Sequence, residues 1–388
     1  MTPLDGIRVL DLTRVLAGPY CTALLADLGA EVIKREPPRG DDHRHIGPFR
    51  DGDSALFRLN NRGKKSLSLN LKTPRGLALA RRIAAQYDVV VENFRPGVAA
   101  KIGLGPDVLR ADNPGLVYAR VAGFGQTGPF RDLPAYDIVV QAMSGLKAAT
   151  GEQGGAPLTA GGSMADLMGG LFGSWAILAA LVGKGRTGTG TVLDIAMYDA
   201  LHSLLTTSHA QHLHAGELPQ RVGNRHPLST PFGCFETRDG QVVIAVLTRA
   251  QFARLAALIG APGLPDVARF STDAARTWHE PELRALIEAW SRRQTTEDAT
   301  VALAEAQLPS APIWDIAQAS GSAHAEARRL GRKGDRRVVG QPVRVDGRKP
   351  AARTGAPGLG ADAGAVLEAL CGVDAATLAP SRYEALVA

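Results

Sequence analysis

The sequence contains few cysteines, and their spacing excludes two structural classes. Only three occur in 388 residues, at Cys21, Cys234 and Cys371, and none belongs to a C-x-x-C pair. This usage excludes a disulfide framework and a zinc ribbon, and it is typical of a protein that stays in a reducing compartment. We therefore expect three buried or unreactive thiols.

A cluster of histidines raises the question of a metal. It consists of His202, His209, His212 and His214. A zinc site would also need a carboxylate or thiolate in register with the imidazoles, and no convincing candidate lies nearby in the sequence. We expect no metal.

The chain also lacks the glycine motifs of common nucleotide-binding folds. A dinucleotide-binding domain places G-x-G-x-x-G directly after its first strand, whereas residues 13–19 of this chain read T-R-V-L-A-G-P. The glycine turn at residues 185–190 is not closed by the Lys-Ser or Lys-Thr pair of a P-loop. We expect neither NAD nor any other permanently bound cofactor.

Signals for export, membrane insertion and nucleic-acid binding are missing as well. No basic segment followed by an apolar one stands at the start, so we expect a cytoplasmic protein. The most apolar run, after Asp166, falls short of the roughly 20 residues that a membrane span needs. The net charge of +6 comes from scattered Arg and Lys without a nucleic-acid-binding motif, which fits a small polyanionic ligand.

What the sequence does contain is an alternation of short apolar runs with helical segments. Runs of strand length occupy residues 7–12, 30–34, 67–71, 88–93, 116–121 and 191–195. Helices are predicted at residues 19–28 and 74–86, the second with Pro74 in its first turn. This alternation predicts a large α/β domain of Rossmann-like type around a mainly parallel sheet.

The second half predicts a smaller α+β domain. Residues 232–237 and 241–246 flank an Arg-Asp-Gly turn that is typical of a hairpin. Amphipathic helices are predicted at residues 251–259, 281–292 and 296–307, and a last short helix at residues 364–371. Polar connectors at residues 218–225 and 331–357 divide the chain into a large domain at 1–217, a small domain at 226–330 and a return to the large domain at 331–388.

One charged residue stands at the start of the most apolar segment. After Asp166 no ionised side chain appears until Lys184, and we expect a buried helix that ends near Gly183. Three glycines, Gly169, Gly170 and Gly173, share the face of Asp166, which indicates close approach of another helix or of a ligand. One interpretation makes Asp166 an N-cap. The other makes it a nucleophile, with the same helix amides available to hold an oxyanion.

A series of short motifs runs through nearly the whole chain. They are L-D-G-I-R-V-L-D-L at 4–12, A-G-P at 17–19, L-G-A-E-V-I-K at 28–34, N-R-G-K-K-S at 61–66, V-E-N-F-R-P-G at 91–97, G-F-G-Q-T-G-P at 123–129, A-Y-D at 135–137 and T-G-T-G at 187–190. In this order they resemble the class III CoA-transferase family, which includes formyl-CoA transferase and carnitine CoA-transferase and has α-methylacyl-CoA racemase among its relatives.

The resemblance implies an architecture and a reaction. Both chain ends would form the large domain, and two subunits would interlock as a homodimer. Asp166 would attack an acyl-CoA thioester to give an aspartyl anhydride and CoA thiolate. The thiolate would then attack the aspartyl carbonyl, and an acceptor carboxylic acid would finally receive CoA. A carboxylate near its reference pKa of about 3.9 is ionised at neutral pH and needs no general base.

Site residues follow from the same resemblance. The family's CoA contacts fall on Arg14, Val15, Ala17, Leu69, Lys72, Asn93, Phe94 and Lys101. We expect Arg225 and His226, in the loop at 223–227, to hold the acceptor and to favour a short dicarboxylate. Formyl-CoA transferase has Gln where this chain has Leu16, and its tetraglycine loop is missing here. Formate and oxalate are therefore doubtful acceptors.

The rival activity is that of an acyl-CoA racemase on the same fold. Racemases of this family place His before Asp where this chain has Tyr136 and Asp137. A phenol with a reference pKa of about 10 is a poor partner for two-sided proton exchange. We therefore predict that Tyr136 donates a hydrogen bond to Asp166 or to the acyl oxygen. A catalytically silent acyl-CoA-binding protein is a third possibility, and the presence of Asp166 argues against it.

Overall fold

The computed structural model describes residues 2–328, 339, 341–350 and 354–373. The chain divides into two units, the first made of Met1–Lys147, Thr159–His209 and Leu330–Ala388 and the second of Ala148–Leu158 and Ala210–Arg329. Of the predicted connector at 331–357, residues 331–338, 340 and 351–353 lie outside the described residues. The division into domains at 1–217, 226–330 and 331–388 stays a prediction.

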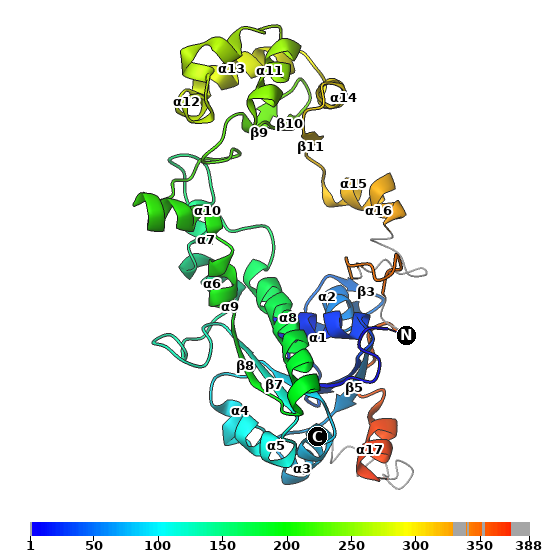
Figure 1. Ribbon diagram of the computed structural model, residues 1–388. Coiled ribbons are helices and arrows are strands. Elements are labelled where there is room, and N and C mark those ends of the chain that lie inside the picture. The colour runs from blue at the N-terminus through cyan, green and yellow to red at the C-terminus, as the bar shows by residue number, and fades with distance from the viewer. Residues whose placement is uncertain (1, 329–338, 340, 351–353, 374–388) are drawn as a thin grey trace. The chain divides into compact units, whose positions relative to one another are not determined.

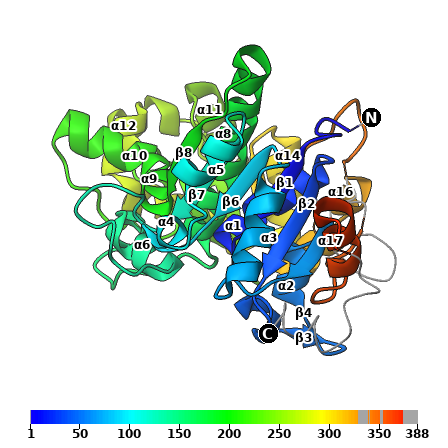
Figure 2. The same cartoon turned by 90° about the horizontal axis from the view of Figure 1, so that it is seen from below.

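The first unit is built on a six-stranded sheet in which every pair of neighbours is parallel. Its strands are β1 (Arg8–Asp11), β2 (Glu31–Glu36), β5 (Lys64–Ser68), β6 (Val89–Glu92), β7 (Val117–Ala122) and β8 (Val192–Ala196). Their spatial order is β5-β2-β1-β6-β7-β8, and Figure 2 shows most of them side by side. The predicted mainly parallel sheet is confirmed.

One strand is displaced from its predicted position. β5 spans Lys64–Ser68, whereas the apolar run predicted a strand at residues 67–71. The reason is that polar side chains occupy the buried face: the Lys64 ammonium lies 2.9 Å from the Asp11 carboxylate, and the Ser66 hydroxyl donates to Glu36 at 2.6 Å. Burial of a charge is acceptable where a partner compensates it, and such a strand does not look apolar in the sequence.

Helices cover both faces of this sheet. On one face α1 (Ala17–Asp27), α8 (Met164–Thr187) and α9 (Met197–Ser203) pack with Val9, Val89 and Val91. On the other face α3 (Pro74–Ala84), α5 (Pro106–Asp112) and α17 (Ala363–Cys371) pack with Leu10 and Val90. Successive strand residues therefore serve opposite cores, as a parallel sheet buried on both faces requires. Figure 1 shows the green α8 beside the blue α1.

Helix α8 differs from its prediction in length and in burial. It continues to Thr187 and ends at Gly188, which has φ +70, so the expected end near Gly183 is wrong. Its length and mean hydropathy of 1.6 would suffice for a membrane span, but it packs on α1, α9, β7 and β8 as a core helix does. Its outer side remains open, with Trp175 66% exposed. The expected burial of the whole helix is therefore wrong.

The second unit is a small α+β body. Its antiparallel sheet has the order β11-β10-β9, with β9 (Phe232–Glu236), β10 (Gln241–Ala245) and β11 (Ser310–Pro312). Helices α11 (Arg249–Leu258), α13 (Glu280–Ser291) and α14 (Thr296–Glu305) enclose a core around Phe235 and Phe252. The predicted hairpin and the three amphipathic helices are confirmed.

The remaining elements are short. The helices are α2 (Ala55–Asn60), α4 (Val98–Lys101), α6 (Asp137–Met143), α7 (Leu146–Ala149), α10 (Thr206–His209), α12 (Asp273–Trp278), α15 (Ile316–Gly321) and α16 (Ala323–Ala327). A 3-10 turn, η1 (Asp42–His45), precedes the two-residue strands β3 (Phe49–Arg50) and β4 (Asp53–Ser54). Of these, α6 and η1 bear on the site described next.

Candidate active site

The strand order places a topological switch between β1 and β6. From β1 the chain adds β2 and β5 on one side and then returns to add β6, β7 and β8 on the other. In open parallel sheets, ligands bind at the carboxyl ends of the strands where the order reverses. The segments after β1 and β6, residues 13–17 and 93–94, carry most of the predicted CoA contacts.

Two of these residues hold each other directly. The Asn93 side chain accepts a hydrogen bond from the Arg14 backbone N–H at 3.0 Å and donates one to the Arg14 carbonyl at 2.8 Å. The Phe94 backbone N–H donates to the Glu92 carboxylate at 2.6 Å. The Arg14 side chain is 59% exposed, 3.5 Å from Asp42. A fixed backbone thus presents a cation to solvent at the switch point.

The other predicted CoA contacts are more dispersed. The Leu69 side chain is buried in the core, and its carbonyl accepts from the Arg35 guanidinium at 2.9 Å, so Leu69 has little left to offer a ligand. Lys72 and Lys101 are exposed and form no ion pair within the described parts of the chain. They lie after β5 and at the end of α4, and no direct contact links them to Arg14 or Asn93 among the described residues.

Asp166 is the third residue of α8 rather than its N-cap. The N-cap is Ser163, whose side chain makes no capping hydrogen bond. The first amides of the helix donate instead to the Asp137 carboxylate, from Ala165 at 2.6 Å and from Asp166 at 3.3 Å. The N-cap interpretation of Asp166 is therefore wrong. These two amides are also occupied, so they are not free to hold an oxyanion.

Asp137 owes its position to a fully buried glutamine. The Gln141 amide nitrogen donates to Asp137 at 2.6 Å and to the Gly162 carbonyl at 2.9 Å, and its oxygen accepts from the Ala160 N–H at 3.0 Å. Gln141 lies one helical turn after Asp137 on α6 and has no exposed surface. It therefore fixes Asp137 and the segment that leads into α8.

The N-terminus of α1 faces the Asp166 carboxylate. The α1 N-cap, Leu16, has no side-chain hydrogen bond, and the first turn contains no acid. Burial and the nearby negative charge of Asp137 raise the pKa of Asp166 to about 7, opposed by a hydrogen bond from the Ala17 backbone. The expectation of a fully ionised carboxylate near its reference pKa is therefore wrong. A carboxyl group with a pKa shifted this far is typical of a functional site.

The glycines of α8 let two helices approach its backbone. A Cβ at Gly170 would lie 2.5 Å from the Ala17 carbonyl oxygen of α1, and one at Gly173 would lie 3.2 Å from the Cys21 sulfur. At Gly169 it would meet Met197 of α9 at 2.8 Å. The predicted close approach is confirmed, and α1 and α9 are the elements that approach. This contact brings the N-terminus of α1 to Asp166.

Tyr136 stands immediately before Asp137, at the N-cap of α6. Its side chain is 75% exposed, and its hydroxyl has no hydrogen-bond partner within the part of the chain that the structure describes. The hydrogen bond to Asp166 or to the acyl oxygen stays a prediction. A free, exposed phenol beside the capping carboxylate remains available to a substrate.

Arg225 and His226 belong to the second unit. Arg225 helps to line a cavity of about 380 Å³ and forms no ion pair with any described residue. The same cavity is lined by Glu152, Glu236, Glu280 and Arg284, of which Arg284 pairs with Glu280 at 2.6 Å. The His226 backbone N–H donates to the Phe232 carbonyl at 2.7 Å, and its ring accepts from the Leu228 N–H at 3.2 Å. A free cation is thus present, but in acidic surroundings.

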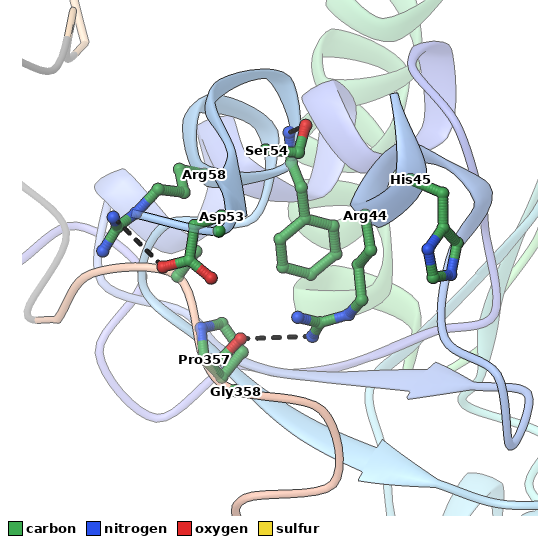
Figure 3. A pocket seen from close by; sticks show the side chains of 10 residues that line it. Arg44, His45, Asp53, Ser54, Arg58, Pro357 and Gly358 are labelled. Atoms are coloured by element: carbon green, nitrogen blue, oxygen red, sulfur yellow. Dashed lines mark hydrogen bonds and ion pairs between the residues drawn. The ribbon is translucent and has the colours of Figure 1, made fainter. Parts of the chain in front are cut away.

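A second hollow, of about 290 Å³, lies in the first unit and is drawn in Figure 3. Arg44 reaches into it and donates to the Pro357 carbonyl at 3.1 Å, while Arg58 pairs with Asp53 at 3.2 Å. Arg44 also forms a two-point contact with Glu36 and stacks over Phe57. Both arginines that line this hollow, Arg44 and Arg58, therefore already have partners within the protein.

The histidines and cysteines have structural surroundings. His202 bonds the Ser144 carbonyl at 2.8 Å, and His209 bonds the His202 carbonyl at 2.8 Å. No group of three metal-ligating side chains occurs within the described residues. Cys21 and Cys371 are buried, Cys234 is partly buried, and burial raises the pKa of all three thiols.

Sequence reasoning missed several residues that shape the site. Asp137 was noticed only as the neighbour of Tyr136, although the A-Y-D motif was the available signal. Gln141 offered no signal beyond its helical spacing from Asp137. No role was predicted for Lys34 or Asp41, whose side chains are completely buried and lie 2.7 Å apart.

The chain is similar in sequence to known proteins over most of its length. A family model described as CoA-transferase family III matches residues 4–363. The chain is 40% identical to succinate–glutarate CoA-transferase of Agrobacterium fabrum, over 84% of each chain. It is also 40% identical to acetyl-CoA:oxalate CoA-transferase of Acetobacter aceti, over 92% of this chain and 93% of that protein.

A solved structure extends the likeness to three dimensions. The crystal structure of a CAIB/BAIF family protein from Brucella suis superposes with a TM-score of 0.86 at 35% identity, over 95% of this chain and 99% of that one. The resemblance seen in the motifs is therefore confirmed over almost the full length.

Proposed function

The chain belongs to CoA-transferase family III, and from this premise we propose that it moves CoA between two carboxylic acids through covalent intermediates on Asp166. The observation that carries the proposal is the Asp166 carboxylate, largely buried at the start of α8 and faced by the uncapped N-terminus of α1. Such a group combines a nucleophile with backbone donors for the charge that develops on an attacked carbonyl.

The reaction runs in four displacements. The ionised Asp166 carboxylate attacks the acyl-CoA carbonyl, the C–S bond breaks, and an aspartyl anhydride and CoA thiolate result. The thiolate attacks the Asp166 carbonyl and releases the donor acid, which leaves an aspartyl-CoA thioester. The acceptor carboxylate attacks that carbonyl and expels CoA thiolate, forming a second anhydride. The thiolate finally attacks the acceptor's carbonyl and frees Asp166.

The raised pKa of Asp166 serves this sequence. A carboxylate that holds a proton more tightly is a stronger nucleophile once it is ionised. Only the ionised form attacks, so kcat/KM of the free enzyme should rise with pH through about 7 and be lost below it. We assign oxyanion stabilisation to the start of α1 rather than to the amides of α8, and the support is that the Ala17 backbone forms a hydrogen bond with Asp166.

CoA binding is assigned to the switch point between β1 and β6. Arg14, Val15, Ala17, Asn93 and Phe94 surround the carboxyl ends of these strands, and exposed Lys72 and Lys101 supply further positive charge for phosphates. The Leu69 side chain is part of the hydrophobic core. Only the backbone around Leu69 could therefore contact CoA. Arg225 and His226 are assigned to the acceptor.

We assign a homodimer and a cytoplasmic location to this enzyme. The support for the dimer is the open side of α8, on which Leu171, Trp175 and Val182 are exposed although the helix is strongly apolar. A second copy of the chain would cover such a face, and interlocked subunits should not separate on dilution. Light scattering that finds an active monomer at micromolar concentration would contradict this assembly.

The covalent mechanism is tested by trapping its intermediates. The enzyme is mixed with a donor acyl-CoA, quenched, digested and analysed by mass spectrometry for an adduct on the peptide that contains Asp166. The acceptor panel includes short dicarboxylates, and it also includes oxalate because a relative acts on it by name. An adduct that forms with donor alone and disappears on addition of acceptor supports the proposal, and turnover without any adduct removes it.

The same sample separates transfer from racemisation. A racemase exchanges the α-proton of a 2-methylacyl-CoA with solvent in the absence of any acceptor. We expect no deuterium in the recovered thioester after incubation in deuterated water, because Tyr136 stands where a racemase would use His. Rapid incorporation would make the racemase the better assignment.

A further inference from the structure

The backbone of the loop after β1 is strained at one residue. Val15 has φ +67, a left-handed conformation that is a genuine outlier for a β-branched side chain. Such a conformation is energetically unfavourable and persists only where the surroundings impose it. Val15 stands one residue before the N-cap of α1, so its conformation sets the direction in which that helix begins.

A buried ion pair imposes this conformation. Asp41 accepts a hydrogen bond from the Val15 N–H at 3.1 Å, and its other oxygen lies 2.7 Å from the Lys34 ammonium. The same ammonium donates to the Thr13 carbonyl at 3.0 Å. The side chains of Lys34 and Asp41 are 0% and 1% exposed. The pair therefore grips the loop on both sides of Arg14.

The charges of this pair are stable. Burial by itself would lower the pKa of Lys34, but the carboxylates of Asp11 and Asp41 outweigh it and raise that pKa. Burial by itself would raise the pKa of Asp41, and the charge of Lys34 outweighs it in turn. Both groups stay ionised across the neutral range, so the ion pair and its hydrogen bonds to the loop persist at neutral pH.

Asn93, which follows β6, fixes the same loop by binding the backbone of Arg14. With its two hydrogen bonds to Arg14, every backbone polar group from the Thr13 carbonyl to the Val15 N–H is bound by a side chain from outside the loop. The chain continues directly into the start of α1, where the Ala17 backbone forms a hydrogen bond with Asp166. A shift of the loop therefore moves the donors that serve the nucleophile.

We propose that Lys34 and Asp41 are positioning residues for the transfer reaction, which hold the strained loop at Val15 so that the N-terminus of α1 stays aimed at Asp166. The inference rests on the proposed role of Asp166 as nucleophile. Neither residue touches the reacting atoms. Their effect passes through the backbone of residues 13–17, which also carries the predicted CoA contacts.

The test compares this pair with a matched buried pair at the C-terminal end of α1. Asp41→Asn and Lys34→Met each remove one charge of the pair. The control is Asp27→Asn, because Asp27 is 1% exposed, pairs with Arg62 at 2.6 Å and lies at the opposite end of the same helix. A control that loses similar thermal stability shows what mere loosening of the fold does to activity.

The readouts are the single-turnover rate of Asp166 acylation and the pH profile of kcat/KM. A displacement of about 1 Å can cost about 10²-fold in rate. We expect acylation to fall by at least about tenfold in Asp41→Asn and Lys34→Met and to stay within about twofold of wild type in Asp27→Asn. The acidic limb should move to higher pH in the first two variants, because the Ala17 N–H opposes the raised pKa of Asp166 only while it is in place; Asp137, the other group acting on Asp166, is unchanged.

The outcomes separate this inference from the proposed function. Equal acylation rates and equal acidic limbs in all three variants would overturn the positioning role while leaving Asp166 acylated. Absence of any adduct in the wild-type enzyme would instead overturn the nucleophile. If a single variant fails to fold, the double variant Lys34→Met/Asp41→Leu leaves no unpaired charge within this pair and is measured with the same readouts.

Discussion

Two buried acids in the first unit, Asp11 and Asp166, differ in the sign of the charges next to them. Asp11 lies completely buried between the ammonium groups of Lys64 and Lys34. Burial alone would raise its pKa, but these charges outweigh burial and hold the pKa well below its usual range. Asp166 has another acid, Asp137, as its charged neighbour, and burial and that charge together raise its pKa to about 7.

The difference shows that burial does not decide what an acid does. Both carboxyl groups are withdrawn from water, yet one is locked as an anion and the other is held near the point of protonation. A compensated carboxylate stabilises the loop around it and is a weak nucleophile. An uncompensated one destabilises its surroundings and gains reactivity, which is the pattern expected of a functional site.

The largest expected effect removes the uncompensated acid. Asp166→Ala should lower transfer by several orders of magnitude, because no neighbouring group can replace the nucleophile. Stability should change little or rise, because a group with a raised pKa opposes folding at neutral pH. Steady-state transfer and thermal melting are measured on the same preparation.

Binding of CoA provides the control for that variant. Since Asp166 is not among the predicted CoA contacts, most of which lie on residues 13–17 and 93–94, Asp166→Ala should retain CoA affinity in calorimetry. Near-normal turnover in a variant that binds CoA would return Asp166 to a structural role and would remove the contrast with Asp11.

The next largest effect is expected from removing Lys64, the cation that compensates the charge of Asp11. Lys64 donates to Asp11 at 2.9 Å, to the Pro19 carbonyl at 2.9 Å and to Asn61 at 2.8 Å, with no exposed surface. Lys64→Met leaves these acceptors buried without that donor and should lower the free energy of unfolding by about 3–5 kcal/mol in urea titration.

The neighbouring lysine is the matched control. Lys65 pairs with Glu31 at 2.9 Å, but both side chains are nearly half exposed. Lys65→Met should cost at most about 1 kcal/mol. Equal losses in the two variants would show that the buried network contributes no more than a surface pair.

A third prediction changes the sign of the environment of Asp166. Asp137→Asn removes the negative charge that raises the pKa of Asp166, so Asp166 should ionise at lower pH. Because the ionised form is the nucleophile, the acidic limb of kcat/KM should move below about 7. Gln141→Met is the control, since it removes a hydrogen bond to Asp137 without removing the charge. A limb that stays in place in Asp137→Asn would contradict the electrostatic argument.

Many of the strands and helices could be predicted because their apolar residues recur with the period of a strand or a helix. The runs at residues 7–12 and 88–93 became β1 and β6, and the glycine face of α8 indicated the helix that packs on it. β5 was misplaced because its buried side chains are polar, and their partners come from other strands. Periodicity contains no information on which distant charge will compensate a buried one.

The candidate site residues named from the sequence stay predictions, and the charges around them could not be predicted from the sequence. The family motifs pointed to Asp166 and to the loop after β1. They did not show that Asp137 caps α8 or that Asp41 and Lys34 hold Val15. These contacts join residues far apart in the sequence, and each residue alone looks like an ordinary surface charge. Only the three-dimensional structure shows that burial and the charge of Asp137 together raise the pKa of Asp166 to about 7.

The smallest expected effect extends the comparison to the second unit, where a cation stands among acids. Arg225 lines the 380 Å³ cavity without an ion-pair partner among the described residues, and Glu152 lines it as well. If Arg225 holds the distal carboxylate of the acceptor, Arg225→Ala should raise the acceptor KM by about tenfold, as loss of one charge-assisted hydrogen bond does. Glu152→Gln should lower the same KM, because it removes a repulsive charge from the cavity. The exposed Arg238 serves as a surface control. If Arg225→Ala and Glu152→Gln leave the KM of every mono- and dicarboxylate unchanged, as in Arg238→Ala, the acceptor does not bind at Arg225. The acidic side chains that line the cavity would then be the physical reason.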